Sequence, residues 1–97
     1  MSDAVRVILP SALREFADGA SELDVDLPPE SCLVRDVLDA ATSDRPLLGA
    51  RVRDETGALR RHVNVFVDGR DVRFGEGQET PVAPGAVVHI LPSVSGG

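Results

Sequence analysis

The sequence predicts an α+β fold in which one sheet packs on one main helix, and three observations lead to that class. Two runs near the start of the chain alternate apolar and polar residues, as half-buried strands do. One stretch in the middle spaces its apolar residues as a helix does. The second half carries a Val-rich hairpin and a further apolar run. The predicted order is therefore strand, strand, helix, strand, short strand, strand.

The first two strands are predicted over residues 4–10 and in the segment SELDVDLPP, residues 21–29. The segment PSALREFADG between them is interpreted as a short helical turn or loop. The two strands then form a hairpin with a long connection. Alternation assigns these residues to the core face: Val5, Val7 and Leu9 in the first strand, and Leu23, Val25 and Leu27 in the second.

The main helix is predicted to begin at Ser31, an N-cap residue type that follows two prolines. It should end near Thr42–Asp44, because Pro46 discourages the residue before it from staying helical. Residues 47–61 show little periodicity and are interpreted as a connector with at most a helical turn. One stripe of the helix is apolar and should face the sheet: Leu33, Val34, Val37, Leu38 and Ala41.

The segment HVNVFVDGRDVRF gives the clearest hairpin signal, because Asp68 and Gly69 favour the positive backbone angles of a two-residue turn. A second turn is expected at Pro84-Gly85, before a last strand over residues 86–91. The predicted core-facing residues are Val63, Val65 and Val67 in the hairpin, and Ala86, Val88 and Ile90 in the last strand. That arrangement leaves Val87, His89 and Leu91 facing outward.

Length and composition favour one small domain over residues 1–97, with a core built mainly from aliphatic side chains. The formal net charge of −6 would repel nucleic acid, although an acidic excess is also an ordinary route to solubility. All ten basic residues are Arg. No apolar run approaches membrane-spanning length, and the lone Cys32 fits a reducing compartment. We therefore expect a cytoplasmic protein with neither nucleic acid nor membrane as a partner.

Groups suited to catalysis are sparse, which argues against an enzyme. Cys32 is expected to be an apolar, structural thiol rather than a reactive one at a helix N-terminus. His62 and His89 are interpreted as surface or strand-edge residues. The carboxylates near the turns fit hairpin chemistry better than metal binding, and the glycines of FGEGQ do not lie between a strand and a helix. We expect no bound cofactor and no metal.

The last residues of the sequence read ILPSVSGG, in which Gly96 and Gly97 directly follow Ser95. Glycines lack Cβ atoms, so they can enter a groove too narrow for other residues. A flexible tail is expected over about residues 92–97, and a frayed terminus is one interpretation of it. Its attachment behind a Val-rich strand favours a function instead, because the strand would direct the tail outward from a rigid base. The carbonyl of a terminal carboxylate becomes an electrophile once an enzyme adenylates it.

The end of the chain resembles the β-grasp, ubiquitin-like sulfur carrier proteins of the MoaD/ThiS superfamily. Their pattern is a turn, a last strand, a proline and a terminal Gly-Gly, matched here by Pro84-Gly85, residues 87–91, Pro92 and Gly96-Gly97. The segments RHVNVFVDGRDVRF and VVHILPSVSGG look most like the CysO type of actinobacteria. The resemblance covers nearly the whole chain and implies a mixed sheet of four to five strands packed on one main helix.

This resemblance implies a co-substrate rather than an enzyme. A ubiquitin-activating-enzyme-like adenylyltransferase and sulfurtransferase would use ATP and magnesium to adenylate the Gly97 carboxylate, with Gly96 beside it. A sulfur donor would then give a thiocarboxylate. In CysO-like systems a cysteine synthase accepts the sulfur and a metalloprotease frees the cysteine. Related carriers supply thiosugar, molybdopterin or thiamine synthesis.

A docking surface for such partners follows from strand parity. If the core-facing valines fill the interior, the alternate side chains face away from the helix and form an exposed apolar patch. Residues 47–61 could instead fold over this patch, and Arg6, Arg60 and Arg61 could rim it. The predicted partner-binding residues are Ile8, Phe66, Val87, Leu91, Pro92 and Val94.

Two other functions stay open on the sequence. The chain could be a protein modifier joined through Gly97 to lysines of target proteins. Without a Lys of its own, it could not build chains on itself. It could also be a plain interaction module whose tail has no chemical role.

Overall fold

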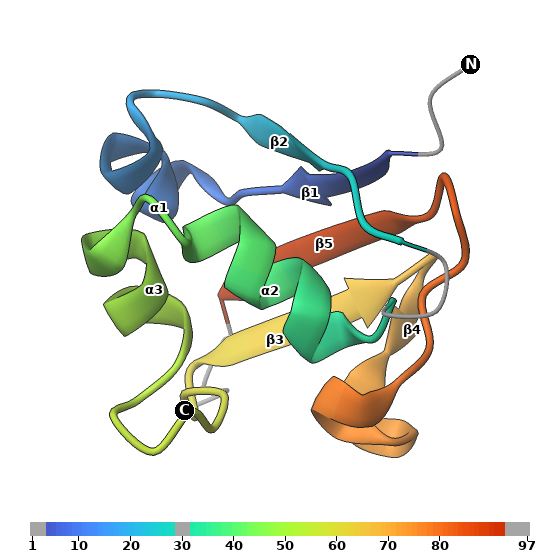
Figure 1. Cartoon of the computed structure of the whole chain (residues 1–97). Helices are drawn as coiled ribbons and strands as arrows, with labels where there is room; N and C mark the ends of the chain where they lie inside the picture. The colour runs from blue at the N-terminus through green and yellow to red at the C-terminus, as the bar shows by residue number, and fades with distance from the viewer. Residues whose placement is uncertain (1–3, 29–31, 93–97) are drawn as a thin grey trace.

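The structure, a computed structural model that describes residues 4–28 and 32–92, is built on one five-stranded sheet (Figure 1). Its strands are β1 (Val5–Ile8), β2 (Glu22–Val25), β3 (Val63–Val67), β4 (Arg70–Asp71) and β5 (Val87–Pro92). They lie in the order β2-β1-β5-β3-β4. β1 and β5 run parallel, and every other neighbouring pair is antiparallel. These pairings confirm the α+β class, the N-terminal hairpin and the mixed sheet.

The main helix, α2 (Val34–Thr42), packs on one face of the sheet as predicted (Figure 1). It begins later than expected, since its N-cap position is Leu33, while Ser31 lies outside the described residues. The Leu33 N–H donates to Asp36 Oδ2 at 3.0 Å, so a carboxylate inside the first turn satisfies this amide. Four residues of the predicted stripe are buried within the helix: Val34, Val37, Leu38 and Ala41.

A second helix, α3 (Pro46–Val52), forms where the sequence predicted a connector with at most a helical turn. Pro46 suits the first turn of a helix, because its φ is already helical and its missing N–H needs no partner there. Leu48 and Val52 lie one turn apart and are buried against the core. Two buried residues give too short a periodic pattern to recognise in the sequence.

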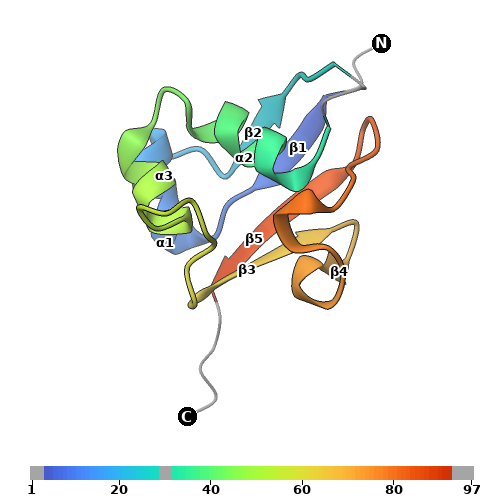
Figure 2. The same ribbon diagram turned by 60° about the horizontal axis from the view of Figure 1, so that its bottom comes forward.

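The connection between β1 and β2 contains α1 (Ser11–Arg14) and a 3₁₀ turn, η1 (Glu15–Ala17), which confirms the predicted helical turn. Together with α3, they lie at the end of the sheet where β1 and β5 finish (Figure 2). Two more 3₁₀ turns follow β4, namely η3 (Val72–Phe74) and η4 (Gly77–Glu79). Among the described helices, none is long and apolar enough to cross a membrane.

The strand residues predicted to face the core are buried, apart from three near the margins of the sheet. These three are partly buried: Leu23, Leu27 and Val67. The register sets Val7 beside Val88 and Val65 beside Ile90, so inward side chains from three strands form adjoining rows. The fully confirmed positions are Val5, Val7, Leu9, Val25, Val63, Val65, Ala86, Val88 and Ile90.

Both predicted turns are present. Asp68 (φ 48°) and Gly69 (φ 88°) have the positive backbone angles that a two-residue hairpin turn requires. Asp68 also ties this turn to β5, because its N–H donates to the Val87 carbonyl at 2.9 Å and its Oδ1 accepts from the Val87 N–H at 3.0 Å. Gly85 has a φ of 78° in the second turn, where a side chain would be strained.

Truncating Leu48 should destabilise the protein by about 2–5 kcal/mol, because Leu48→Ala leaves a cavity beneath α3. The neighbouring substitution Leu47→Ala removes the same atoms from a side chain that is 67% exposed. It should change the free energy of unfolding by less than about 0.5 kcal/mol. Urea unfolding followed by circular dichroism measures both. An equal decrease in the free energy of unfolding for the two variants would contradict the packing of α3 against the core.

Candidate functional site

β5 lies at the centre of the sheet and brings its last residues, Leu91 and Pro92, to one end of the molecule (Figure 2). We call these two residues the tail root. β1 pairs with β5 on one side, and β3 pairs with it on the other as far as the Val63–Pro92 pair. The predicted site residues Val94, Gly96 and Gly97 lie outside the described residues. The surface around the tail root is therefore the described part of the site.

The predicted apolar patch lies on the sheet face opposite α2, and its side chains are partly exposed. The register places Ile8 and Phe66 on either side of His89. Val87 and Leu91 are the neighbours of His89 two residues away along β5. We define these five residues as the outer patch. Strand alternation predicted that His89 faces outward, but its central position in the patch depends on the strand register and was not predicted.

The outer patch is not covered by the segment that follows α2. α3 lies beside α2 on the opposite face of the sheet (Figure 1). Arg53 pairs with Asp39 of α2 at 2.7 Å, and the Arg60 side chain donates to the Ala50 carbonyl of α3. These contacts hold the segment on the helical side. Of the arginines expected at the rim, Arg6 borders the patch opposite Val87 and pairs with Glu22 at 3.6 Å.

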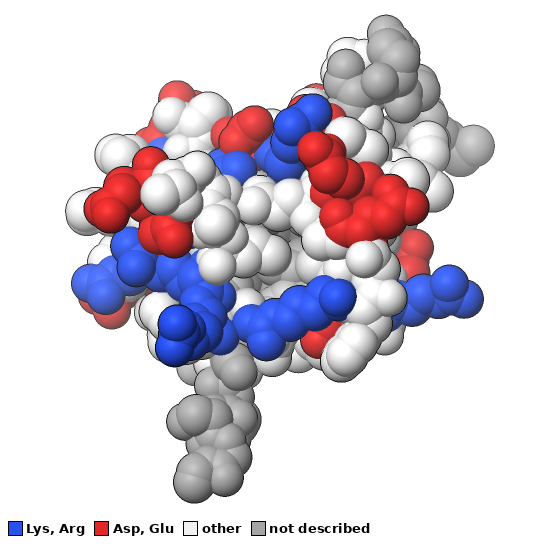
Figure 3. Space-filling model, turned by 90° about the horizontal axis from the view of Figure 1, so that it is seen from below, with Lys and Arg blue, Asp and Glu red and all other residues white. Residues whose placement is uncertain are grey.

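Arginine side chains gather at the end of the molecule that carries the tail root (Figure 3). Arg73 reaches back from η3 and donates through Nη2 to the carbonyls of Arg61 (3.0 Å) and Val63 (2.9 Å). Within residues 4–28 and 32–92, Arg51, Arg61 and Arg73 form no ion pair with an acidic side chain. We call these three the basic rim. They provide local positive charge on a chain whose net charge is −6.

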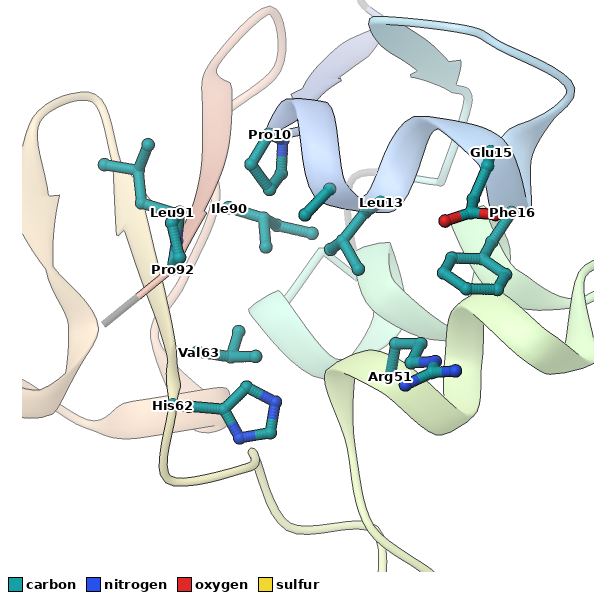
Figure 4. Close-up of a pocket in the computed structure, with 11 residues that line it drawn as sticks. Pro10, Leu13, Glu15, Phe16, Arg51, His62, Val63, Ile90, Leu91 and Pro92 are labelled. Atoms are coloured by element: carbon teal, nitrogen blue, oxygen red, sulfur yellow. The ribbon is translucent and has the colours of Figure 1, made fainter. Parts of the chain in front are cut away.

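A cleft of about 270 Å³ opens beside the tail root on the helical side of the sheet (Figure 4). Leu13, Phe16 and Ile90 give it an apolar floor. The guanidinium carbon of Arg51 lies 4.8 Å from the centre of the Phe16 ring, and His62 lines the cleft nearer β3. The residues of this root cleft are Pro10, Ala12, Leu13, Glu15, Phe16, Arg51, His62, Val63, Ile90, Leu91 and Pro92.

The root cleft was missed in the sequence for a simple reason. Its walls come from α1 and η1, from α3, and from the ends of β3 and β5. The sequence predicted the first segment only as a turn or loop and the second only as a connector. A cavity assembled from four separate segments has no local pattern, so only the tertiary structure reveals it.

Cys32 does not have the surroundings of a reactive thiol. Burial, and to a lesser degree the negative charge of Asp36, raise the pKa of Cys32, which supports the structural interpretation. His62 lies in the root cleft and His89 on the other face of the sheet, so the structure does not bring the two histidines together. In the described part of the chain, no group of three or more His, Cys, Asp or Glu side chains could hold a metal ion.

The sequence profile of the ThiS family matches residues 7–97. The chain belongs to this family. It is 35% identical over 95 residues to the sulfur carrier protein CysO of Mycobacterium tuberculosis, which covers 96% of this chain and 98% of the relative. It is 34% identical over 87 residues to small archaeal modifier protein 1 of Haloferax volcanii, covering 84% and 94% of the two chains. Sulfur carriers and ubiquitin-like modifiers are thus both among its relatives.

A solved structure supports the same family assignment. The fold superimposes with a TM-score of 0.83 on a chain of the Amycolatopsis orientalis BexX/CysO complex, at 34% identity and over 97% of this chain and 100% of that one. The matches confirm the predicted MoaD/ThiS resemblance, including its CysO type, and the β-grasp, ubiquitin-like fold.

Cys32 should react slowly with iodoacetamide, with a pH–rate midpoint above that of free cysteine, because burial and Asp36 disfavour the thiolate. Asp36→Asn removes the negative charge but keeps an oxygen that can accept the Leu33 N–H. This variant should move the midpoint to lower pH. Alkylation rates of the folded protein across a pH series test both statements. A wild-type midpoint below that of free cysteine would instead indicate an activated thiol.

Proposed function

We propose that the chain is a sulfur carrier whose Gly97 carboxylate is adenylated by a partner enzyme and converted to a thiocarboxylate that donates sulfur in biosynthesis. The observation that carries this proposal is the ThiS-family match, which extends through Gly97. Similarity to sulfur carrier protein CysO over 96% of the chain supports it. The CysO similarity favours cysteine synthesis as the pathway, with thiosugar, molybdopterin and thiamine synthesis as alternatives.

Adenylation changes the leaving group on the Gly97 carbonyl. A carboxylate oxygen attacks the α-phosphorus of ATP, pyrophosphate leaves, and an acyl adenylate forms. Sulfur at the oxidation level of sulfide then attacks the carbonyl carbon, the bond to AMP breaks, and a thiocarboxylate results. ATP and magnesium belong to the partner, so this chain acts as a co-substrate without a bound cofactor. Gly96 and Gly97 keep the reacting carbonyl free of side-chain crowding.

The described residues support this chemistry by fixing the tail root beside a docking surface. β5 is paired on both sides as far as His89, and its pairing with β3 continues through Leu91 and Pro92, which holds Pro92 next to the outer patch. The apolar side chains of that patch suit the desolvated centre of a protein interface. In this proposal, Pro92 and Val94 continue the docking surface along the tail.

Two kinds of partner follow from the proposed reaction. One is a ubiquitin-activating-enzyme-like adenylyltransferase and sulfurtransferase. The other is a sulfur-accepting synthase, either cysteine synthase-like or a thiosugar synthase. A metalloprotease is needed where the product stays joined to Gly97. The crystal structure of a complex between BexX and a CysO supports docking of such carriers on other proteins.

Similarity to small archaeal modifier protein 1 favours a second candidate, a protein modifier conjugated through Gly97. Both candidates begin with adenylation, and they diverge at the nucleophile that attacks the adenylate. A sulfide-level donor gives a carrier, whereas a lysine amine of a target protein gives a conjugate.

Incubation with the adenylating enzyme of the native host, ATP, magnesium and sulfide should raise the intact mass by the difference between one sulfur and one oxygen atom. Deleting Gly97 should abolish this change, because the remaining carboxylate no longer reaches the reacting phosphorus. Mass spectrometry of the intact protein measures both. Ladders of larger conjugates in host extracts would favour the modifier. An unchanged mass with an active enzyme would exclude the carrier.

Phe66→Asp should raise the KM of the adenylating enzyme for this chain about 30-fold, because it places a charge beside His89 within the apolar outer patch. Phe74→Asp is the matched control, since Phe74 lies on η3, outside the outer patch, and is 92% exposed. Its KM should stay within about twofold of the wild type. Pyrophosphate exchange at varied carrier concentrations provides both constants. Equal effects would exclude the outer patch as a docking surface.

A further inference from the structure

We infer that the root cleft is a second docking site, which receives an acidic segment of the adenylating enzyme that carries one apolar side chain. This inference rests on the proposed function. It adds to the outer patch a second surface, which the alternation of residues in the strands did not predict. The outer patch and the root cleft lie on opposite faces of the sheet, and both border the tail root. An enzyme that covers both would hold the carrier from two sides of β5.

The shape and chemistry of the cleft fit a single apolar anchor. Its volume of about 270 Å³ exceeds the ~150 Å³ of an apolar cavity that binds benzene. Leu13 and Ile90 line it from facing elements, and the Phe16 ring closes one side (Figure 4). One aromatic or branched side chain of a partner would therefore fill it and exclude water, as interface anchors do.

Chain length brings the partner close to this cleft. Five residues follow Pro92, and an extended chain of that length spans at most about 17 Å. An enzyme that holds Gly97 in its active site must bring the rim of that site within this reach of Pro92. Pro92 itself lines the root cleft, so the rim of the enzyme lies against the cleft or directly beside it.

The adenylating enzyme has a particular need for contacts away from the reacting atoms. It must bring a carboxylate against the α-phosphate of a nucleotide, although both groups are anionic. Binding energy from remote contacts has to offset that repulsion. The root cleft is a concave surface that borders the tail root and can provide such contacts.

The charges around the cleft indicate an acidic segment. Arg51 lines it and, like Arg61 and Arg73, forms no ion pair with an acidic side chain in residues 4–28 and 32–92. Arg51 and Glu15 balance within the cleft, so the positive charge offered to a partner at this end comes from Arg61 and Arg73 beside it. Because the net charge of the chain is −6, these arginines attract an acidic partner segment that the chain as a whole repels. That contrast would set the orientation of the complex.

Two pairs of variants test the cleft with the adenylating enzyme of the native host and a pyrophosphate-exchange assay. Ala12→Trp fills the cleft from an exposed lining position, and Ala83→Trp makes the same change before the Pro84-Gly85 turn, at the other end of β5. Arg51→Glu reverses a rim charge, and Arg70→Glu makes the same change on β4. Thermal unfolding by circular dichroism confirms that each variant is folded.

Each cleft variant should raise KM about tenfold with little change in kcat, and Arg51→Glu should also weaken the salt dependence of kcat/KM. The controls should stay within about twofold of the wild type. Cleft variants that match their controls would overturn the inference and leave the proposed function intact. So would variants that impair only the transfer of sulfur from a preformed thiocarboxylate to the acceptor synthase. Absence of exchange with the unmodified chain would overturn the proposed function and this inference together.

Discussion

The pairing of β5 with β1 on one side and β3 on the other is the constraint on which the rest of the site depends. β5 is the central strand, so its backbone hydrogen bonds and its inward side chains Val88 and Ile90 are shielded from solvent. β5 is paired on both sides as far as His89, and Leu91 and Pro92 continue the strand opposite Asn64 and Val63 of β3. In the proposed function, a partner therefore meets Pro92 at the end of a strand that is anchored in the centre of the sheet.

The two-residue repeat of β5 links stability to recognition. Val88 and Ile90 fill the core, while Val87, His89 and Leu91 point the other way and belong to the outer patch. Ile90 also lines the root cleft, so one inward side chain contributes to both the core and the cleft. Changes at outward positions can thus alter docking with little effect on folding, whereas changes at Ile90 affect both.

Local patterns predicted the strands and turns well, because alternation and the Asp68-Gly69 pair act over a few residues. They were less successful where tertiary contacts decide the structure. α3 depends on two buried residues, Leu48 and Val52, and becomes recognisable only once the core beside it exists. The start of α2 moved to Val34 because Asp36 satisfies the preceding backbone amide. The central place of His89 and the root cleft both needed the strand register and the packing of distant segments.

In the proposed function, the tail expected from the sequence gives a carrier a reason to have docking surfaces on its folded body. Ordering five residues of such a tail inside an enzyme would cost about 5–10 kcal/mol at roughly 1–2 kcal/mol each, and glycines lie towards the upper end. Val94 is the one large apolar residue in that segment, and its burial contributes only about 1.5–3 kcal/mol. Contacts made by the tail alone would leave binding weak. Surfaces beside Pro92 that are already ordered lose little entropy on binding, so the outer patch and the root cleft are where the missing free energy can arise.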